Sequence, residues 1–216
     1  MSDLLERFCR LPPAALSDCL RGMHTLDSSI HSMTSGLGLS GAVFTVLAQA
    51  GSIITVHKAL LEAPEGSVLV VGGETARDLN GALFGKLMAI QARLRGILGL
   101  VVDGAVRDVA DLREMAFPVF ARCTTPRVGM NRTVGQTQVP TLCGGIIVHP
   151  GDYVCGGDDG ITLIPAALVE QVVLKAEARL QKEAVYVQRM EAGEHITDLI
   201  GFTELIYEDN QFPHKG

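Results

Sequence analysis

The stretch Ile97-Leu-Gly-Leu-Val-Val-Asp-Gly-Ala-Val-Arg-Asp-Val109 decides the fold of this chain. Its first part, 97–102, is a short apolar run, which is typical of a strand buried on both faces. We predict a loop over 103–108 and a short helix over 109–115. Comparable apolar runs occur at 67–71 and 118–121. Strands and helices therefore alternate through the middle of the chain, and this order predicts an α/β fold with right-handed parallel crossovers.

A stripe of leucine and isoleucine precedes this stretch. Its members recur at spacings of four, four, three and four residues, and they are Leu79, Leu83, Leu87, Ile90 and Leu94. This spacing places them on one face of a predicted helix, with Asp78 as a plausible cap and Gly96 at its end. We also predict helices over 13–23 and 57–61, and a strand over 41–47.

Beyond residue 125 the pattern changes to short strand runs separated by turns. These runs are 139–142, 145–148, 153–154 and 161–164, and they favour antiparallel pairing. The segment Gly156-Gly-Asp-Asp-Gly160 fits a tight turn better than a Ca²⁺ site, because no further ligands follow at EF-hand spacing. A long helix is predicted from about 165 to 190. We therefore expect a single domain over 1–216, with a C-terminal helical extension from about residue 165.

Composition excludes several classes of protein. The 216 residues are 47% hydrophobic and 19% charged, which is enough apolar material for a buried core. The net charge of −6, the absence of Trp and an aromatic content of 5% argue against a nucleic-acid partner and against an anionic membrane surface. The uncharged segment 32–56 is too rich in glycine and hydroxyl residues for a membrane span. Five scattered cysteines without a Cys-x-x-Cys pair, and no secretory signal, favour free thiols in the cytoplasm.

The most suggestive motif is Asp103-Gly-Ala-Val-Arg-Asp108, because it directly follows a buried strand, where α/β folds place their sites. Arg107 offers a rigid fork that matches a carboxylate, and Asp108 offers a hard oxygen ligand for Mg²⁺. The alternative is that Asp108 only caps the helix beginning at Val109 while Arg107 is solvated. Spacing alone favours this alternative.

The segment Gly81-Ala-Leu-Phe-Gly-Lys-Leu87 is a second candidate, because backbone N–H groups near a helix start can bind an anion. It is not a nucleotide-binding P-loop, since the glycine spacing is one residue short and Leu87 replaces the hydroxyl residue. The alternative is close packing of a helix on a strand at Gly85. His57, His149 and His195 have no partner at a telling spacing and are interpreted as structural.

Several of these motifs together resemble the RraA-like family. They are Gly81 to Gly96, Gly99 to Val109, Phe117-Pro-Val-Phe-Ala-Arg122, Pro140 to Asp152 and Asp158-Asp-Gly-Ile161. The family contains regulators of ribonuclease activity A and aldolases for 4-hydroxy-4-methyl-2-oxoglutarate (HMG) and 4-carboxy-4-hydroxy-2-oxoadipate. The resemblance covers about residues 13–200. It implies a β/β/α sandwich of the swivelling phosphohistidine-domain type, assembled as a homotrimer or hexamer with sites between subunits.

The resemblance also implies a chemistry and a set of residues. Family aldolases use Mg²⁺ or Mn²⁺ to cleave small 2-oxo acids to pyruvate, and they decarboxylate oxaloacetate. By position, Arg107 would bind the pyruvyl group and stabilise the enolate, and Asp108 would be the metal ligand. The backbone amides of Gly85, Lys86 and Leu87 would bind the substrate carboxylate. Glu183 would reach the site of a neighbouring subunit and contact its metal-bound water.

Lys86 departs from the aldolase pattern, in which an acidic residue stands at this spacing before the Arg-Asp pair. Three alternatives are open for its ammonium group. It pairs with Asp108 in place of the metal, it reaches into solvent, or it forms a Schiff base with the substrate. The Schiff base is the least favoured, because a neighbouring carboxylate raises the pKa of a lysine. We expect Lys86 to influence catalysis by weakening metal binding and lowering lyase activity.

Two functions therefore compete. The first is a divalent-metal-dependent lyase of small 2-oxo acids, of the HMG aldolase or oxaloacetate decarboxylase type, with Arg107, Lys86 and Glu183 as catalytic residues. The second is a protein without enzymatic activity that binds and regulates ribonuclease E, as RraA itself does.

Overall fold

The computed structural model describes residues 3–49, 52–73, 81–131 and 134–208. The chain divides into two compact units, one over 1–174 and one over 175–216. The expected single domain over 1–216 stays a prediction. No helix in the described ranges is long and apolar enough to cross a membrane.

Four parallel strands form the centre of the first unit. In spatial order they are β6 (Val119–Thr124), β5 (Gly99–Val106), β3 (Ser67–Gly72) and β2 (Leu39–Leu47). Every residue of β3 and β5 is buried, as the continuous apolar runs predict for strands covered on both faces. The α/β class expected from the sequence is therefore confirmed.

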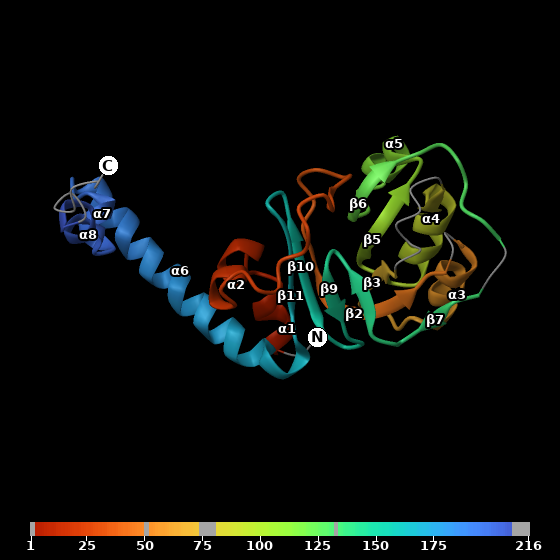
Figure 1. Ribbon diagram of the computed structural model, residues 1–216, viewed down its shortest axis with the longest axis horizontal. Helices are drawn as coiled ribbons and strands as arrows, with labels where there is room; N and C mark the ends of the chain where they lie inside the picture. The colour runs from red at the N-terminus through yellow and green to blue at the C-terminus, as the bar shows by residue number, and fades with distance from the viewer. Residues whose placement is uncertain (1–2, 50–51, 74–80, 132–133, 209–216) are drawn as a thin grey trace, which may run out of the picture. The chain divides into compact units, whose positions relative to one another are not determined.

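Alternate residues of these strands enter two separate cores. In β3, Leu69 and Val71 belong to a cluster that contains residues of three helices, α3 (Ile54–Glu62), α4 (Lys86–Leu94) and α5 (Val109–Glu114). These helices lie together on one side of the sheet (Figure 1). Val68 and Val70 enter a second cluster, which contains residues of other β-strands. The strand period of two thus produces the β/β/α layering, because successive side chains point to opposite faces.

Antiparallel strands complete the sheet beyond β2 and β6. Beyond β2 come β10 (Tyr153–Gly157) and β11 (Gly160–Ile164), and beyond β6 comes β1 (His31–Ser32). The short β7 (Gln136–Thr137) pairs with β2, and β8 (Thr141–Cys143) with β9 (Ile146–Val148) forms a hairpin of its own. The antiparallel pairing predicted after residue 125 is confirmed, as is the turn between β10 and β11.

Two helices begin the chain. They are α1 (Asp3–Phe8), which the sequence reading did not identify, and α2 (Pro13–Cys19), which packs against β11 and ends before the predicted limit of 23.

Three features of this part of the chain differ from the prediction. The apolar stripe is not one helix, because residues Ala82–Phe84 form β4, which pairs with β5, and α4 begins only at Lys86. Within α4 the core face is Met88, Ala89 and Ala92, whereas Leu87 and Leu94 are each 77% exposed. The helical spacing of Leu87, Ile90 and Leu94 is therefore real, but these residues lie on the exposed face of α4. Leu79 and Asp78 lie outside the described residues. The third difference is at β5, which continues through the predicted loop to Val106.

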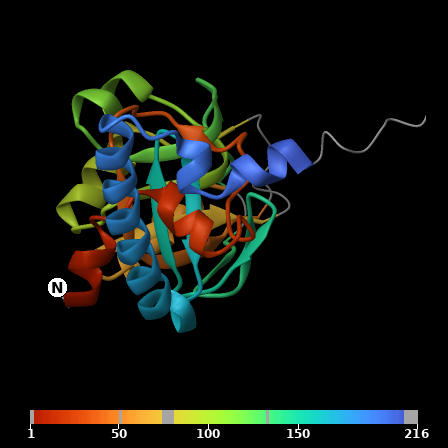
Figure 2. The same cartoon turned by 90° about the vertical axis from the view of Figure 1, so that its left-hand side faces the viewer.

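The second unit begins within α6 (Val169–Glu191), at residue 175. This helix is continuous in both views (Figures 1 and 2). A short 3₁₀ turn, Ala166–Leu168, precedes α6. The long helix predicted over 165–190 is therefore confirmed to within a few residues. Two short helices follow, α7 (Ile196–Leu199) and α8 (Phe202–Glu208).

Extension of β5 buries Asp103 completely, and its carboxylate is held by structural contacts. Arg122 on β6 donates a hydrogen bond from Nε to Oδ1 of Asp103, and the amide of Gly144 donates to Oδ2 at 2.8 Å. The hydrogen bond between Arg122 and Asp103 is the largest cause of the raised pKa of Arg122. Asp103 thus ties β5 to β6 and to the β8–β9 turn, and it does not share the solvent-facing position of Arg107.

We predict that Arg122→Ala lowers the free energy of unfolding by about 3–5 kcal/mol, because the buried Asp103 carboxylate loses its cation. Lys58→Ala, which removes an exposed pair with Glu62, is the control and should cost at most about 1 kcal/mol. Urea denaturation of both variants measures the difference. Equal losses would show that the Asp103–Arg122 pair does not stabilise the sheet.

Candidate functional site

The candidate site lies where β4 and β5 end side by side. The amide of Arg107 donates a hydrogen bond to the carbonyl of Phe84 at 3.0 Å, so the two strands end at the same level. Gly85 and Lys86 continue from β4 into α4, and Arg107 and Asp108 continue from β5 into α5. Two helix starts therefore meet at the carboxyl ends of parallel strands, the edge at which α/β folds bind ligands.

Asp108 is held in an unusual conformation at this junction. Its backbone is left-handed, with φ 57° and ψ 35°, a region that aspartate enters more readily than most residues. It occupies the N-cap position of α5, but its side chain makes no capping hydrogen bond there. Instead Oδ2 accepts the backbone N–H of Lys86 at 3.0 Å, at the start of α4. The simple cap suggested by the sequence is therefore wrong, because the carboxylate serves the neighbouring helix.

Gly85 provides the space for this contact. A Cβ atom at this position would lie 2.7 Å from Oδ2 of Asp108 and 2.9 Å from Cγ of Arg107. The φ of −166° is ordinary extended backbone, so the need for glycine arises from the close approach alone. Gly85 is therefore closely packed, but by the side chains of Arg107 and Asp108 and not by the predicted contact of a helix with a strand.

Arg107 and Asp108 are close to each other and reach solvent. Nε of Arg107 lies 3.6 Å from Oδ2 of Asp108, and their side chains are 39% and 37% exposed. The fork and the carboxylate expected from the motif are thus adjacent, and both are accessible to a ligand.

Lys86 points to a different carboxylate from the one expected. Its Nζ lies 2.5 Å from Oδ1 of Asp111, one turn into α5, so the predicted pairing with Asp108 is wrong. The hydrogen bond to Asp111 is the main cause of the raised pKa of Lys86, followed by the charge of Asp111, with further contributions from Glu114 and Asp108. The backbone amide of Lys86 is also engaged by Asp108. Of the three amides expected to bind a carboxylate, this one is already used.

A small cavity of about 110 Å³ opens beside Arg107. Its lining comes from α3, β4, α4 and the segment after β6, and it consists of Ile53, His57, Ala82, Phe84, Gly85, Leu87, Met88, Arg107 and Val128. The sequence reading treated His57 as structural. No hydrogen bond or ion pair of the His57 ring occurs in the described part of the chain. No sequence spacing could have found it, because only the crossover from β2 through α3 brings it near Arg107.

The described residues at this junction offer few ligands for a divalent cation. No group of three or more His, Cys, Asp or Glu side chains within the described residues is arranged to hold a metal. Asp108 does not line the cavity, but it lies next to Arg107, and its side chain is 37% exposed. A single carboxylate would hold Mg²⁺ or Mn²⁺ only together with waters and substrate oxygens as the other ligands.

Glu183 lies in the second unit and pairs with Arg179 at 3.0 Å on α6. Its predicted contact with a neighbouring site stays a prediction.

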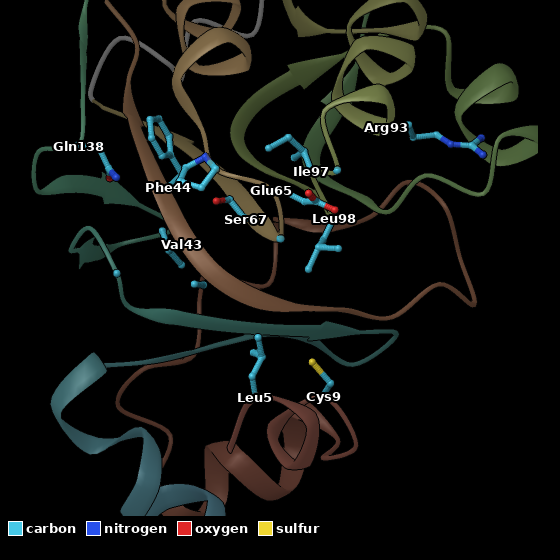
Figure 3. Close-up of a pocket in the computed structure, with 15 residues that line it drawn as sticks. Leu5, Cys9, Val43, Phe44, Glu65, Ser67, Arg93, Ile97, Leu98 and Gln138 are labelled. Carbon is cyan, nitrogen blue, oxygen red and sulfur yellow. The ribbon is translucent and has the colours of Figure 1, made fainter. Parts of the chain in front are cut away.

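A larger cavity of about 880 Å³ lies at the opposite ends of the parallel strands (Figure 3). Leu5 and Cys9 form one side of it, and Phe44, Ile97 and Leu98 contribute to the other. Burial raises the pKa of the Cys9 thiol, which keeps it protonated and poorly nucleophilic. The lining is mostly apolar but includes Glu65 and Arg93, which form no ion pair with each other among the described contacts. The smaller cavity, where Arg107 lies beside Asp108, is therefore the better candidate for polar chemistry.

Known proteins share this architecture. The family model for RraA-like proteins, described as Aldolase/RraA, matches residues 13–163. A protein of Halalkalibacterium halodurans, named "Putative 4-hydroxy-4-methyl-2-oxoglutarate aldolase", is 34% identical over 177 residues, which are 82% of this chain and 83% of that protein.

Two solved structures are similar over most of their length. An uncharacterized protein from Pseudomonas syringae pv. tomato has a TM-score of 0.83 at 28% identity, covering 92% of this chain and 93% of the other. RraAS2 of Streptomyces coelicolor, described as an unusual member of the RNase ES inhibitor RraA protein family, has a TM-score of 0.76 at 25% identity, covering 88% and 98%. The RraA-like fold expected from the sequence is confirmed.

We predict that Lys86 forms no Schiff base. Its raised pKa keeps the amine as an ammonium at near-neutral pH, and only the neutral amine attacks a carbonyl. Incubation with pyruvate and borohydride, followed by peptide mass spectrometry, should therefore find Lys86 unmodified, as in a sample without pyruvate. A reduced pyruvyl adduct on Lys86 would contradict this interpretation.

Proposed function

Because this chain belongs to the RraA-like family, we propose that it is a divalent-metal-dependent lyase that cleaves small 2-oxo acids and releases pyruvate. The observation that carries the proposal is that Arg107, which lines a cavity of about 110 Å³, lies 3.6 Å from the carboxylate of Asp108. A guanidinium fork and a hard oxygen ligand are the two groups that a 2-oxo carboxylate and its metal require.

Arg107 would bind the substrate through its carboxylate or its 2-oxo group. Cleavage of the C3–C4 bond of a 2-oxo acid leaves the electron pair on C3, from which it is delocalised onto the 2-oxo oxygen as an enolate; a proton added at C3 then gives pyruvate. A fixed guanidinium near that oxygen stabilises the charge as it develops. The cavity is small and partly apolar, with Phe84, Leu87 and Met88 in its lining. Its volume suits the three-carbon pyruvyl part of the substrate.

Asp108 would hold Mg²⁺ or Mn²⁺, which when bound supplies a Lewis acid for the 2-oxo oxygen. The hydrogen bond from the Lys86 amide fixes one oxygen of Asp108 and leaves Oδ1 directed elsewhere. The left-handed backbone at Asp108 is the kind of local strain that occurs at functional sites. We infer that HMG and oxaloacetate are suitable substrates, because both yield pyruvate through the same enolate.

A second candidate function is regulation of ribonuclease E by direct binding, without catalysis. The similarity to RraAS2 favours it. So does Lys86, which replaces the acidic residue of the aldolases with a cation. Pyruvate release separates the two candidates, because a binding protein needs neither Arg107 nor a metal for its action.

The exposed apolar residues of the second unit support assembly with other copies of the chain. In α6 they include Val185, Val187 and Met190, and in α8 they are Phe202, Leu205, Ile206 and Tyr207. Apolar surface of this extent commonly marks a protein interface. We therefore propose a homotrimer or hexamer in which Glu183 of one copy completes the site of another.

We predict that Arg107→Ala lowers the rate of Mg²⁺-dependent pyruvate release from HMG or oxaloacetate roughly a hundred- to a thousandfold, because the enolate charge loses its main cation. Arg95→Ala is the matched control, since Arg95 is exposed and its side chain donates to the Leu61 carbonyl, far from the Arg107–Asp108 pair in the sequence. Coupling to lactate dehydrogenase measures the rate. Unchanged turnover in Arg107→Ala would show that lyase activity does not reside at this site.

We also predict that activity requires the oligomer. Light scattering during turnover should find a trimer or hexamer, and Glu183→Gln should lower kcat at least roughly tenfold without changing the molar mass. Glu191→Gln, at the end of the same helix, should have little effect. A fully active monomer would refute the shared site.

A further inference from the structure

The cavity beside Arg107 has a second ionisable group in its lining. Among the described residues that line it, only Arg107 and His57 carry ionisable side chains. A guanidinium stays protonated in proteins, whereas an imidazole commonly gains and loses a proton near neutral pH. Within the described lining, His57 is therefore the group suited to proton transfer.

The position of His57 follows from the way in which α3 begins. The amide of Ile53 donates a hydrogen bond to the carbonyl of Met130 at 3.0 Å, which joins the start of α3 to the segment after β6. Ile53 and His57 are four residues apart, so they share one side of the helix, and both line the cavity. Val56 and Ala59 are completely buried in the core. The packing of α3 thus holds the imidazole at the cavity while His57 remains exposed to solvent.

The size of the cavity brings both groups to one substrate. A three-carbon pyruvyl group that enters a space of about 110 Å³ and binds Arg107 comes close to the other residues of the lining, His57 among them. The remaining described residues of the lining, such as Phe84 and Met88, have no side chain that can give or take a proton.

Cleavage of a 4-hydroxy-2-oxo acid requires two proton movements. The 4-hydroxyl group loses its proton as the C3–C4 bond breaks and C4 becomes a carbonyl carbon. The electron pair of that bond passes to C3 and onto the 2-oxo oxygen as an enolate, and C3 then gains a proton to give pyruvate. One group can serve both steps, because the proton taken from the hydroxyl is the proton that C3 needs.

We propose that His57 is the acid–base residue of this cleavage. Its neutral imidazole accepts the proton of the 4-hydroxyl group, and the resulting imidazolium returns that proton to C3, so His57 ends the reaction as it began. Arg107 stabilises the enolate between the two steps. This inference rests on the proposed lyase function with Arg107 as its cation, and it does not require Asp108 to hold a metal.

Two substrates separate this role from a structural one. Cleavage of HMG removes a hydroxyl proton, whereas decarboxylation of oxaloacetate releases CO₂ and leaves an enolate that can take its proton from water. His57→Gln should therefore lower kcat for HMG roughly a hundredfold, leave kcat for oxaloacetate within roughly threefold, and leave both KM values nearly unchanged. His149→Gln is the matched control, since His149 is exposed and is not among the residues that line this cavity. It should keep both rates.

Exchange of the pyruvate methyl protons with D₂O, followed by proton NMR, isolates the C3 step. The wild type should catalyse this exchange, and His57→Gln should slow it roughly a hundredfold. Free imidazole should restore part of the exchange in His57→Ala, where it can take the place of the missing ring, but not in Arg107→Ala.

Full HMG cleavage by His57→Gln, with an active wild type and an inactive Arg107→Ala variant, would overturn the role of His57 and leave the proposed function intact. An equal loss on both substrates, or a raised KM with unchanged methyl exchange, would also overturn it, because His57 would then act on structure or on binding. A wild-type protein that releases no pyruvate from either substrate would contradict the proposed function and with it the inference.

Discussion

The hydrogen bond from the Lys86 amide to the Asp108 carboxylate is the contact on which the site depends. It joins the start of α4 to the start of α5, and it requires that no side chain stands at Gly85, where a Cβ would lie 2.7 Å from the same oxygen. Arg107 then has a fixed neighbour and faces a small cavity. The buried parallel strands bring these helix starts together, and the hydrogen bond from Lys86 to Asp108 joins them.

The two partly exposed aspartates at this junction, Asp108 and Asp111, have different partners. Asp108 is shared by Arg107 and a main-chain amide, whereas Asp111 takes the lysine. Asp103, the first residue of the Asp103–Asp108 motif, is buried, and its carboxylate accepts a hydrogen bond from Arg122. Three aspartates that lie within nine residues of one another in the sequence thus have three roles: a candidate ligand, a partner for a lysine, and a structural anchor.

Much of the sheet could be predicted from the sequence, because its strands are continuous apolar runs and such runs have few other uses in a soluble chain. The leucine stripe misled the prediction, since helical spacing identifies a face but not whether that face is buried. The C-terminal end of β5 was also predicted too early. The sequence places Asp103 in a loop, because its partner Arg122 lies on another strand and is far away in the sequence. His57 and Asp111 could not be assigned at all, because their relation to Arg107 and Lys86 exists only through the packing of α3 and α5.

A crystal structure of the protein soaked with Mg²⁺ and oxalate, a stable mimic of the pyruvate enolate, tests the central claim most directly. The account predicts oxalate on the Arg107 guanidinium, the cation on Asp108, and Lys86 still paired with Asp111. An empty cavity beside Arg107 under saturating ligand, or a Lys86 ammonium lying on Asp108 in place of the cation, would contradict it.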